Sequence, residues 1–327
     1  MTARLHERVA EALGEPRAGL AVSAVVAGET VHVSRGEARP GGRPVTPDTI
    51  FELGSVTKVF TGIMLAACVR DGTVTLDDRL SRHLPRHRAS FDPTLRELAT
   101  HASGLPNVTR GLDPREVAFA LGVTAHDPHA SLTRAAFEEA LARTRARRRR
   151  FRYSSLGVAL LGEALAAAAG RPYETLLRER LLAPLGMVDT VVDPRSLLRL
   201  ATGASALGRE RPPFDDRLLV PAGGLRSTAR DMTAFVRANL EPEGELGAAL
   251  ELALAPARRV SRGFAIGLCW LIVRSRGRVL HWHNGGTWGF RSFVALDRDV
   301  GGGVAVLSNR ARSVDRLGLR LVERLPQ

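Results

Sequence analysis

Apolar residues form strand-like patterns near both ends of the chain and recur at helical spacing in its middle. Near the N-terminus, a short helix precedes two predicted strands, Gly19 to Ala27 and Thr30 to Glu37, and the pair Gly28-Glu29 between them is typical of a hairpin turn. Four further strands are predicted near the C-terminus: Phe264 to Arg274, Arg278 to His283, Phe290 to Asp297 and Gly303 to Ser308. Both ends of the chain are therefore expected to contribute strands.

Helical periodicity dominates the rest of the chain. Ser55 opens a helix that the apolar spacing extends to about Arg70, and Asp71-Gly72 predicts its end. The other expected helices are Arg134 to Thr144, Leu156 to Ala169, Tyr173 to Leu182 and Val314 to Leu325.

Strands at both ends with helices between them predict an α/β (α+β) fold. The sheet would be mostly antiparallel because short turns join its strands, and it would be built from both termini and flanked by helices, with a helical region inserted. We expect a single unit over residues 1–327, in which 1–80 and 206–327 hold the sheet and 81–205 are mainly helical.

Composition places the chain among soluble globular proteins, with 44% hydrophobic and 25% charged residues. No stretch approaches the roughly 20 apolar residues of a membrane-spanning helix. The first residues also lack the apolar core of a signal peptide, so we expect a cytoplasmic protein. Cys68 and Cys269 are too few and too far apart for a disulfide framework, and both are expected to be buried.

The net charge of +13 raises the alternative of a nucleic-acid-binding or membrane-surface protein. The basic residues are spread along the chain, however, and lack the interleaved aromatic residues on which bases stack. The densest run, Arg143 to Arg152, lies at the expected end of a helix, where a solvated surface explains it. We therefore expect no nucleic-acid partner.

Lys58 is the only lysine among the 47 basic residues. An ammonium group can lose its proton near neutral pH when it is buried, whereas a guanidinium group stays protonated. Lys58 follows Ser55 by one helical turn, so both side chains fall on the same face of the predicted helix. A neutral amine there can activate the hydroxyl as a nucleophile, and the helix N-terminus favours an oxyanion. The alternative is a helix-capping serine followed by a surface lysine.

Two further motifs carry groups suited to the same chemistry. Tyr153 precedes Ser154 and Ser155 just before a predicted helix, and a phenol beside a cation can shuttle a proton. A tyrosine at the edge of the core, next to a capping serine, is the alternative explanation of this motif.

The second motif, His283-Asn284-Gly285-Gly286-Thr287, follows a predicted strand on which His281 and His283 share one face. Its glycines would let a ligand approach the strand edge, where backbone N–H groups are free to donate. A zinc site on the two histidines is the alternative. No third ligand stands at a recognisable spacing, so we expect no metal.

Together and in this order, these motifs resemble those of the serine β-lactamase and penicillin-binding-protein superfamily. The likeness is greatest to the class C branch, which also contains esterases, D-peptidases and transacylases. It covers nearly the whole chain and implies a single catalytic unit with a β-lactamase/transpeptidase-like fold. The matching segments are Phe51 to Gly62, Leu98 to Pro106, Tyr153 to Gly162, Pro184 to Thr190, Pro221 to Met232 and His283 to Phe290.

The resemblance implies a role for each matching residue. Ser55 would be acylated, and Lys58 and Tyr153 would move the proton of its hydroxyl to the leaving group. The backbone N–H groups of Ser55 and Gly286 would form the oxyanion hole. The substrate-binding residues that it implies are Ser155, His283, Asn284 and Gly285. It implies neither a metal nor an organic cofactor.

Three departures from the family pattern bear on the substrate. His283 stands where β-lactamases carry the lysine of a Lys-Thr-Gly motif, and a histidine is mostly neutral at pH 7, which favours esters, amides or peptides over penicillins. Ser155 replaces a more frequent asparagine and would hydrogen-bond the substrate or Lys58. The run Arg147 to Arg150 replaces a proline-glycine turn, and it either attracts an anionic substrate or is solvated surface.

These observations favour a serine hydrolase that acts on small carboxylic esters through an acyl-enzyme on Ser55. The alternatives within the enzyme class are a D-amino-acid-specific peptidase or amidase, a biosynthetic transacylase and a weak β-lactamase. A catalytically silent binding homologue is the alternative from another class, and the complete set of Ser55, Lys58 and Tyr153 argues against it. We expect the substrate to be a small ester, amide or peptide.

Overall fold

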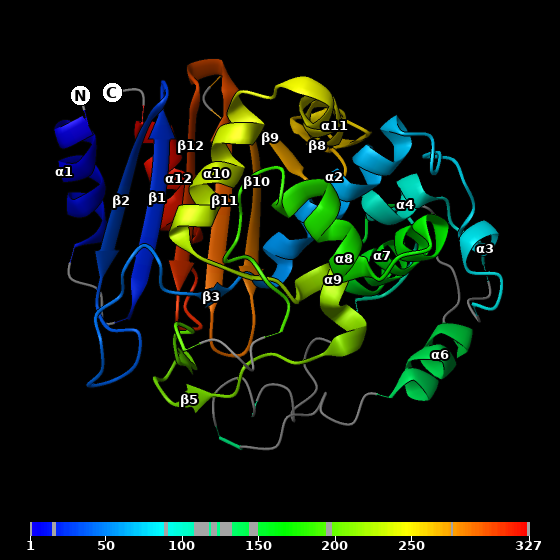
Figure 1. Cartoon of the computed structure of the whole chain (residues 1–327), viewed down its shortest axis with the longest axis horizontal. Coiled ribbons are helices and arrows are strands. Elements are labelled where there is room, and N and C mark those ends of the chain that lie inside the picture. Colours follow the sequence, from blue (N-terminus) through cyan, green and yellow to red (C-terminus); the bar gives the residue numbers. More distant parts are fainter. Residues whose placement is uncertain are drawn as a thin grey trace.

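The structure of the chain is a computed structural model, which describes residues 2–14, 18–87, 91–107, 118, 123–124, 133–143, 150–193, 198–275 and 277–325. Within this part, strands from both ends form an eight-stranded sheet in the order β2-β1-β12-β11-β10-β9-β8-β7 (Figure 1). Neighbouring strands in it run antiparallel. The strands are β1 (Leu20–Val26), β2 (Glu29–Arg35), β7 (Arg258–Ser261), β8 (Phe264–Ile266), β9 (Leu271–Ser275), β10 (Arg278–Gly286), β11 (Arg291–Asp297) and β12 (Gly302–Ser308). The predicted sheet built from both termini is thereby confirmed.

The centre of the sheet joins the two ends of the chain directly. β1 pairs with β12, from Leu20 opposite Ser308 to Val26 opposite Gly302. Both strands are almost wholly buried because helices cover both faces of the sheet. Burial on both faces explains why their sequences are nearly continuous apolar runs instead of alternating ones.

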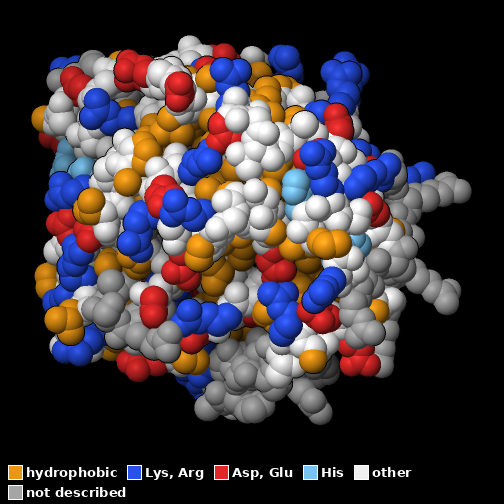
Figure 2. All heavy atoms as spheres, turned by 45° about the vertical axis from the view of Figure 1, so that its right-hand side comes forward, with side chains coloured by type: hydrophobic (Ala, Val, Ile, Leu, Met, Phe, Trp, Pro, Cys, Tyr) orange, Lys and Arg blue, Asp and Glu red, His pale blue; other side chains and the backbone are white. Residues whose placement is uncertain are grey.

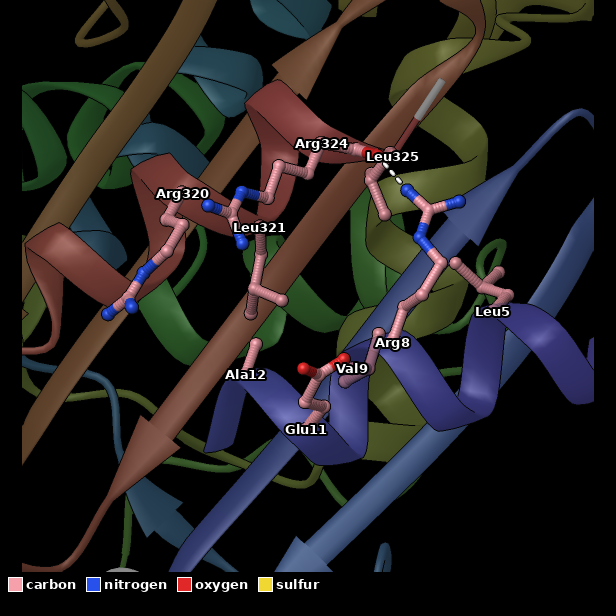
Figure 3. A pocket seen from close by; sticks show the side chains of 9 residues that line it. All are labelled: Leu5, Arg8, Val9, Glu11, Ala12, Arg320, Leu321, Arg324 and Leu325. Atoms are coloured by element: carbon pink, nitrogen blue, oxygen red, sulfur yellow. Dashed lines mark hydrogen bonds between the residues drawn. The ribbon is translucent and has the colours of Figure 1, made fainter. Parts of the chain in front are cut away.

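Helices α1 (Thr2–Leu13) and α12 (Asp315–Arg324) cover one face of the sheet. The apolar residues that join them to it include Leu5, Val9, Val22, Val306 and Val322. A hollow of about 400 Å³ lies between the two helices, and in it Arg8 donates a hydrogen bond to the carbonyl oxygen of Arg324 (Figure 3). The residues that line this hollow include none of the predicted site residues.

The opposite face packs against α10 (Ala229–Leu240) and the central helix α2 (Thr57–Arg70). α2 is buried along nearly its whole length, which is typical of a helix that is apolar on all sides. It lies close to its neighbours at Gly62, where a Cβ atom would stand 2.0 Å from the carbonyl oxygen of Leu268. The start of α2 is therefore fixed between the sheet and the helices that follow.

Further helices surround α2 on the side away from the sheet (Figure 1). The longest of them, α7 (Ser155–Ala169), begins after Ser154, whose Oγ accepts a hydrogen bond from Gly157 N–H, and ends at Gly170 in the left-handed conformation. The other helices are α3 (Leu80–His83), α4 (Leu95–Ala99), α6 (Arg134–Arg143), α8 (Tyr173–Leu177), η2 (Arg178–Leu182), η3 (Arg217–Leu219), α9 (Val220–Gly223), α11 (Gly244–Leu254) and η4 (Arg298–Val300). The short strands are β3 (Phe51–Glu52), β4 (Gly203–Ala204), β5 (Glu210–Arg211) and β6 (Arg226–Ser227).

The predicted strand from Phe264 to Arg274 is wrong in one respect, because it is two strands, β8 and β9. A tight turn separates them: Gly267 N–H donates to the carbonyl oxygen of Trp270, and Cys269 adopts φ +64°. The sequence analysis also missed α10 and α11, for which it predicted no element. Cys68 and Cys269 are free and buried, as predicted.

Charged residues of both signs share the surface. On the face shown in Figure 2, arginine side chains are interspersed with acidic and uncharged ones. The helices of the described residues are too short or too polar to cross a bilayer. Of the run Arg147 to Arg150, only the exposed Arg150 belongs to the described part, so the prediction for this run lies outside it.

Candidate active site

Ser55 lies in a single 3₁₀ turn, η1 (Gly54–Val56), which leads directly into α2. Gly54 adopts φ +50°, a left-handed conformation that favours glycine. A Cβ atom at Gly54 would stand 2.6 Å from the backbone nitrogen of Gly286. The glycine therefore lets the end of β10 approach the half-buried Ser55.

Lys58 is wholly buried one turn after Ser55. Its Nζ atom donates hydrogen bonds to Ser55 Oγ at 2.9 Å and to the carbonyl oxygen of Ala222 at 2.7 Å. Burial lowers the pKa of Lys58 from its usual 10.5 to about 7. Once the amine has lost a proton, it can keep its bond to Ala222 and present a lone pair to Ser55. The alternative of a capping serine followed by a surface lysine is wrong, because Lys58 is buried and Val56 occupies the cap of α2.

Tyr153 reaches the same point from the segment that precedes α7. Its phenol shares a hydrogen bond with Ser55, and Lys58 Nζ lies 5.1 Å from the centre of its ring. Burial raises the pKa of Tyr153, and the bond to Ser55 offsets only part of this shift. The phenol therefore keeps its proton at neutral pH, whereas Lys58 is partly unprotonated there and is the base available to Ser55.

His283 on β10 is fully buried beside these groups, with its ring centre 6.1 Å from that of Tyr153. Its Nδ1 atom lies 2.6 Å from the carbonyl oxygen of Asn284, so Nδ1 carries the proton of the neutral ring. Burial lowers the pKa of His283 to about 3, and the nearby Lys58 acts in the same direction. The ring is therefore uncharged at neutral pH.

The two predicted oxyanion-hole donors, Ser55 and Gly286, come from η1 and from the end of β10. Thr287 N–H donates to Phe290 O across the turn to β11, and donors alternate along an antiparallel ladder. Gly286, which pairs with Arg291, therefore directs its N–H away from β11. Next to it, a Cβ atom at Gly285 would stand 2.0 Å from the carbonyl oxygen of Leu53, so β10 packs tightly against η1.

We expect Gly54→Ala to lower kcat by about 100-fold, the loss typical of a displaced oxyanion donor. The new methyl group would force Ser55 and Gly286 apart and would hold alanine in a left-handed conformation. Steady-state kinetics on an activated ester measures the change, with Gly72→Ala as the control, because Gly72 is also left-handed but has no atom near its Cβ position. Equal losses in both variants would contradict this explanation.

The other two predicted substrate-binding residues occupy different positions. Asn284 lines the cavity described below, and its Nδ2 donates to Asp315 Oδ2 at 2.8 Å. Ser155 is the first residue of α7, and its backbone N–H donates to Asn107 Oδ1. It is not among the residues that line the cavity, and Lys58 Nζ bonds to Ser55 and Ala222 instead of to its hydroxyl.

A cavity of about 760 Å³ opens over Ser55 and Tyr153. The sequence analysis missed several residues of its wall: Phe214, Leu271, Trp288, Arg291 and Asp315. Arg291 is half-buried, and its Nη1 donates to the carbonyl oxygens of Thr287 and Phe290. No local pattern identifies these residues, because they come from separate loops and strand ends.

A buried ion pair supports one wall of this cavity. Glu52 and Arg226, from β3 and β6, lie 3.3 Å apart with both side chains almost completely covered. Glu52 Oε1 also accepts a hydrogen bond from the backbone N–H of Phe214 at 2.7 Å. The pair therefore anchors the loop that carries Phe214 over Ser55.

Within the described residues, no group of three or more histidine, cysteine and carboxylate side chains is arranged so that it could hold a metal ion. His281 instead places Nε2 3.2 Å from the carbonyl oxygen of Leu254. The absence of a metal stays a prediction from the sequence.

Comparisons with known proteins show the family of the chain. The family model described as Beta-lactamase matches residues 6–325. The chain is 32% identical, over 70% of its length, to the D-alanyl-D-alanine-carboxypeptidase/endopeptidase AmpH of Escherichia coli (strain K12), of which it covers 59%. It is 26% identical, over 90% of its length, to a Beta-lactamase of Pseudomonas fluorescens, of which it covers 88%.

Among solved structures, a class C beta lactamase from Rhodobacter sphaeroides superposes with a TM-score of 0.80 at 25% identity, covering 99% of this chain and 97% of that one. The chain spans about three fifths of the length of AmpH. The family match nevertheless extends over almost the entire sequence, from α1 to α12, and includes every predicted site residue. This chain belongs to the Beta-lactamase family.

Proposed function

We propose that the chain is a serine hydrolase that forms an acyl-enzyme on Ser55 and acts on small carboxylic esters. The observation that carries the proposal is the buried amine of Lys58, which lies 2.9 Å from Ser55 Oγ and has a pKa of about 7. A general base works best when its pKa lies near the operating pH, because it can then both take and return a proton.

In the acylation step, Lys58 Nζ takes the proton of Ser55 Oγ while this oxygen bonds to the carbonyl carbon of the ester. The carbonyl oxygen becomes an oxyanion, which the backbone N–H groups of Ser55 and Gly286 would stabilise. Collapse of the intermediate breaks the bond to the leaving alcohol oxygen. That oxygen takes a proton from Tyr153, and the phenol regains one from Lys58.

In the deacylation step, water attacks the carbonyl carbon of the acyl group on Ser55. Its proton passes through Tyr153 to Lys58, because burial raises the pKa of the phenol and makes it a relay instead of the first base. When the second intermediate collapses, Ser55 Oγ leaves the acyl carbon and recovers its proton from Lys58. The acid is released and the site returns to its starting state.

The neutral state of His283 supports esters over penicillins as substrates. The ring is buried and its pKa is about 3, so it offers no fixed positive charge at the position of the family's Lys-Thr-Gly lysine. An uncharged ester does not require such a charge, whereas the carboxylate of a penicillin is stabilised by it.

A D-amino-acid-specific peptidase is the second candidate, and Arg291 favours it. Its half-buried guanidinium lines the same cavity as Ser55 and offers a cation to the terminal carboxylate of a peptide. The similarity to AmpH, a D-alanyl-D-alanine-carboxypeptidase/endopeptidase, supports the same candidate.

The test compares p-nitrophenyl esters, a chromogenic cephalosporin and D-amino-acid amides as substrates of the full chain. We expect ester turnover to be the fastest, and mass spectrometry of the trapped intermediate to find the acyl group on Ser55. Ser55→Ala should abolish both, since no hydroxyl is left beside Lys58.

The matched control is Ser261→Ala, which removes the hydroxyl of an exposed serine on β7 and should leave turnover unchanged. Faster turnover of the amides or the cephalosporin would overturn only the proposal that esters are the substrates, and Ser55 would remain the proposed nucleophile. An acyl group on any residue other than Ser55 would overturn the assignment of Ser55 as the nucleophile.

A further inference from the structure

His101, which the sequence analysis did not single out, lies against Tyr153 in the turn after α4. Its side chain is fully buried, and its backbone adopts φ +53°. Few residues other than glycine adopt this left-handed conformation, although histidine and asparagine do so more often than most, and it persists where the surrounding contacts enforce it. The contacts that hold His101 in this conformation therefore indicate its role.

His101 contacts three consecutive residues of the segment that carries the proposed proton relay. Its carbonyl oxygen accepts a hydrogen bond from Arg152 N–H at 2.8 Å, and its Nδ1 accepts one from Ser154 N–H at 3.3 Å. Between these two bonds, its ring packs on that of Tyr153 with the ring centres 4.5 Å apart. One residue thus holds Tyr153 by its ring and by the backbone on both sides.

The bond from Ser154 fixes the tautomer of His101. A backbone N–H can only donate, so Nδ1 must present its lone pair and the proton of the neutral ring lies on Nε2. Burial lowers the pKa of His101 well below its usual range, and Lys58 and His283 act in the same direction. The ring thus stays neutral and keeps its acceptor at every pH at which Lys58 exchanges its proton.

The rest of the same loop holds the following residues. Ser154 Oγ donates to the carbonyl oxygen of Pro106 at 2.8 Å, and Ser155 N–H donates to Asn107 Oδ1 at 3.1 Å. These bonds connect the loop to the start of α7. His101 is the residue of this loop whose ring contacts Tyr153 itself.

We propose that His101 is a positioning residue, which holds the phenol of Tyr153 at Ser55 and Lys58 through its ring contact and its Nδ1 bond to Ser154. The inference rests on the proposed function, in which Tyr153 relays protons. It goes beyond that function because His101 touches neither the cavity nor the reacting hydroxyl. Loss of the ring contact or of the Nδ1 hydrogen bond should therefore lower kcat and leave KM little changed.

Two substitutions test the ring contact and the Nδ1 hydrogen bond of His101 separately. His101→Phe keeps a ring against Tyr153 but has no acceptor for Ser154 N–H. His101→Asn places an acceptor near the position of Nδ1, and asparagine tolerates the left-handed backbone. We expect kcat for an activated ester to fall about 100-fold in the phenylalanine variant, the loss typical of a small misplacement. The asparagine variant should recover at least about 10-fold of this loss.

The matched control is His87→Phe, which makes the same exchange at a histidine between α3 and α4, outside the site. It should leave kcat unchanged. The proposal is overturned if the His101→Phe variant keeps kcat within about threefold of the unaltered chain, or if folded His101→Asn is no better than folded His101→Phe.

A second readout does not depend on activity. The chain has two tyrosines, Tyr153 and Tyr173, and ring-labelled tyrosine gives one NMR signal set for each, which Tyr153→Phe assigns. In both His101 variants the Tyr153 signals should shift and broaden, while those of Tyr173, whose hydroxyl lies 2.7 Å from Thr61 Oγ1, should not.

Unchanged Tyr153 signals in a folded His101 variant would overturn the proposal. If the phenylalanine variant does not fold, the asparagine variant supplies this readout. If the unaltered chain turns over no substrate, the proposed function fails, and the tyrosine signals alone then test the role of His101.

Discussion

Exchanging Lys58 for arginine should abolish turnover, with kcat/KM falling by about 1,000-fold or more. The arginine keeps a positive charge and several donors, but its guanidinium cannot release a proton at neutral pH. Ser55 would then have a hydrogen-bond donor beside it and no base. Measurement of kcat/KM on an activated ester tests this prediction, with circular dichroism to check the fold.

The control makes the opposite substitution, arginine to lysine, at an exposed position. Arg230→Lys, at an exposed pair with Asp48, should leave kcat/KM unchanged. A Lys58→Arg variant that retains a tenth of the activity would show that charge at this position suffices, and the proposed role of Lys58 as a base would be wrong.

Replacing Lys58 by methionine should stabilise the folded chain below pH 7. Burial lowers the pKa of Lys58 from 10.5 to about 7, so between these values the unfolded chain binds more protons than the folded one. The contribution of Lys58 to stability therefore rises with pH across this window and is lowest below pH 7. The displaced pKa corresponds to a penalty of about 5 kcal/mol at low pH.

Methionine removes that penalty but leaves the carbonyl oxygen of Ala222 without its donor. Ser55 Oγ lines the cavity and keeps its hydrogen bond with Tyr153. One unpaired buried group costs about 1–3 kcal/mol, so the expected net gain in the free energy of unfolding is about 2–4 kcal/mol at pH 6. The gain should shrink as the pH rises towards 10.5. Urea unfolding of both proteins at several pH values isolates Lys58, because all other groups titrate in both. A difference that does not change with pH would contradict the low pKa.

Most strands of the sheet could be predicted because each is marked in the local sequence by apolar residues and by the turn residues beside it. β1 and β12 are apolar runs and the turns beside them contain glycine, so local sequence identifies them. The division between β8 and β9 was missed, because the left-handed Cys269 and the bond from Gly267 N–H to Trp270 O arise only in the folded chain.

Motif spacing predicted Ser55, Lys58 and Tyr153, and the structure brings these three side chains together. Motif spacing could not show which of Ser154 and Ser155 caps α7. That choice depends on hydrogen bonds to the loop at Pro106, which is distant in sequence. His101 was present in a matching segment, yet its contact with Tyr153 joins segments far apart in the sequence. Arg291 was missed for the same reason.

The central claim is that Lys58 exchanges its proton near neutral pH. Because it is the only lysine in the chain, isotope-labelled lysine gives a single side-chain signal that NMR can follow from pH 5 to pH 11. The account predicts a titration midpoint near pH 7 in the folded protein. A midpoint near 10.5, the ordinary value for an exposed lysine, would contradict it.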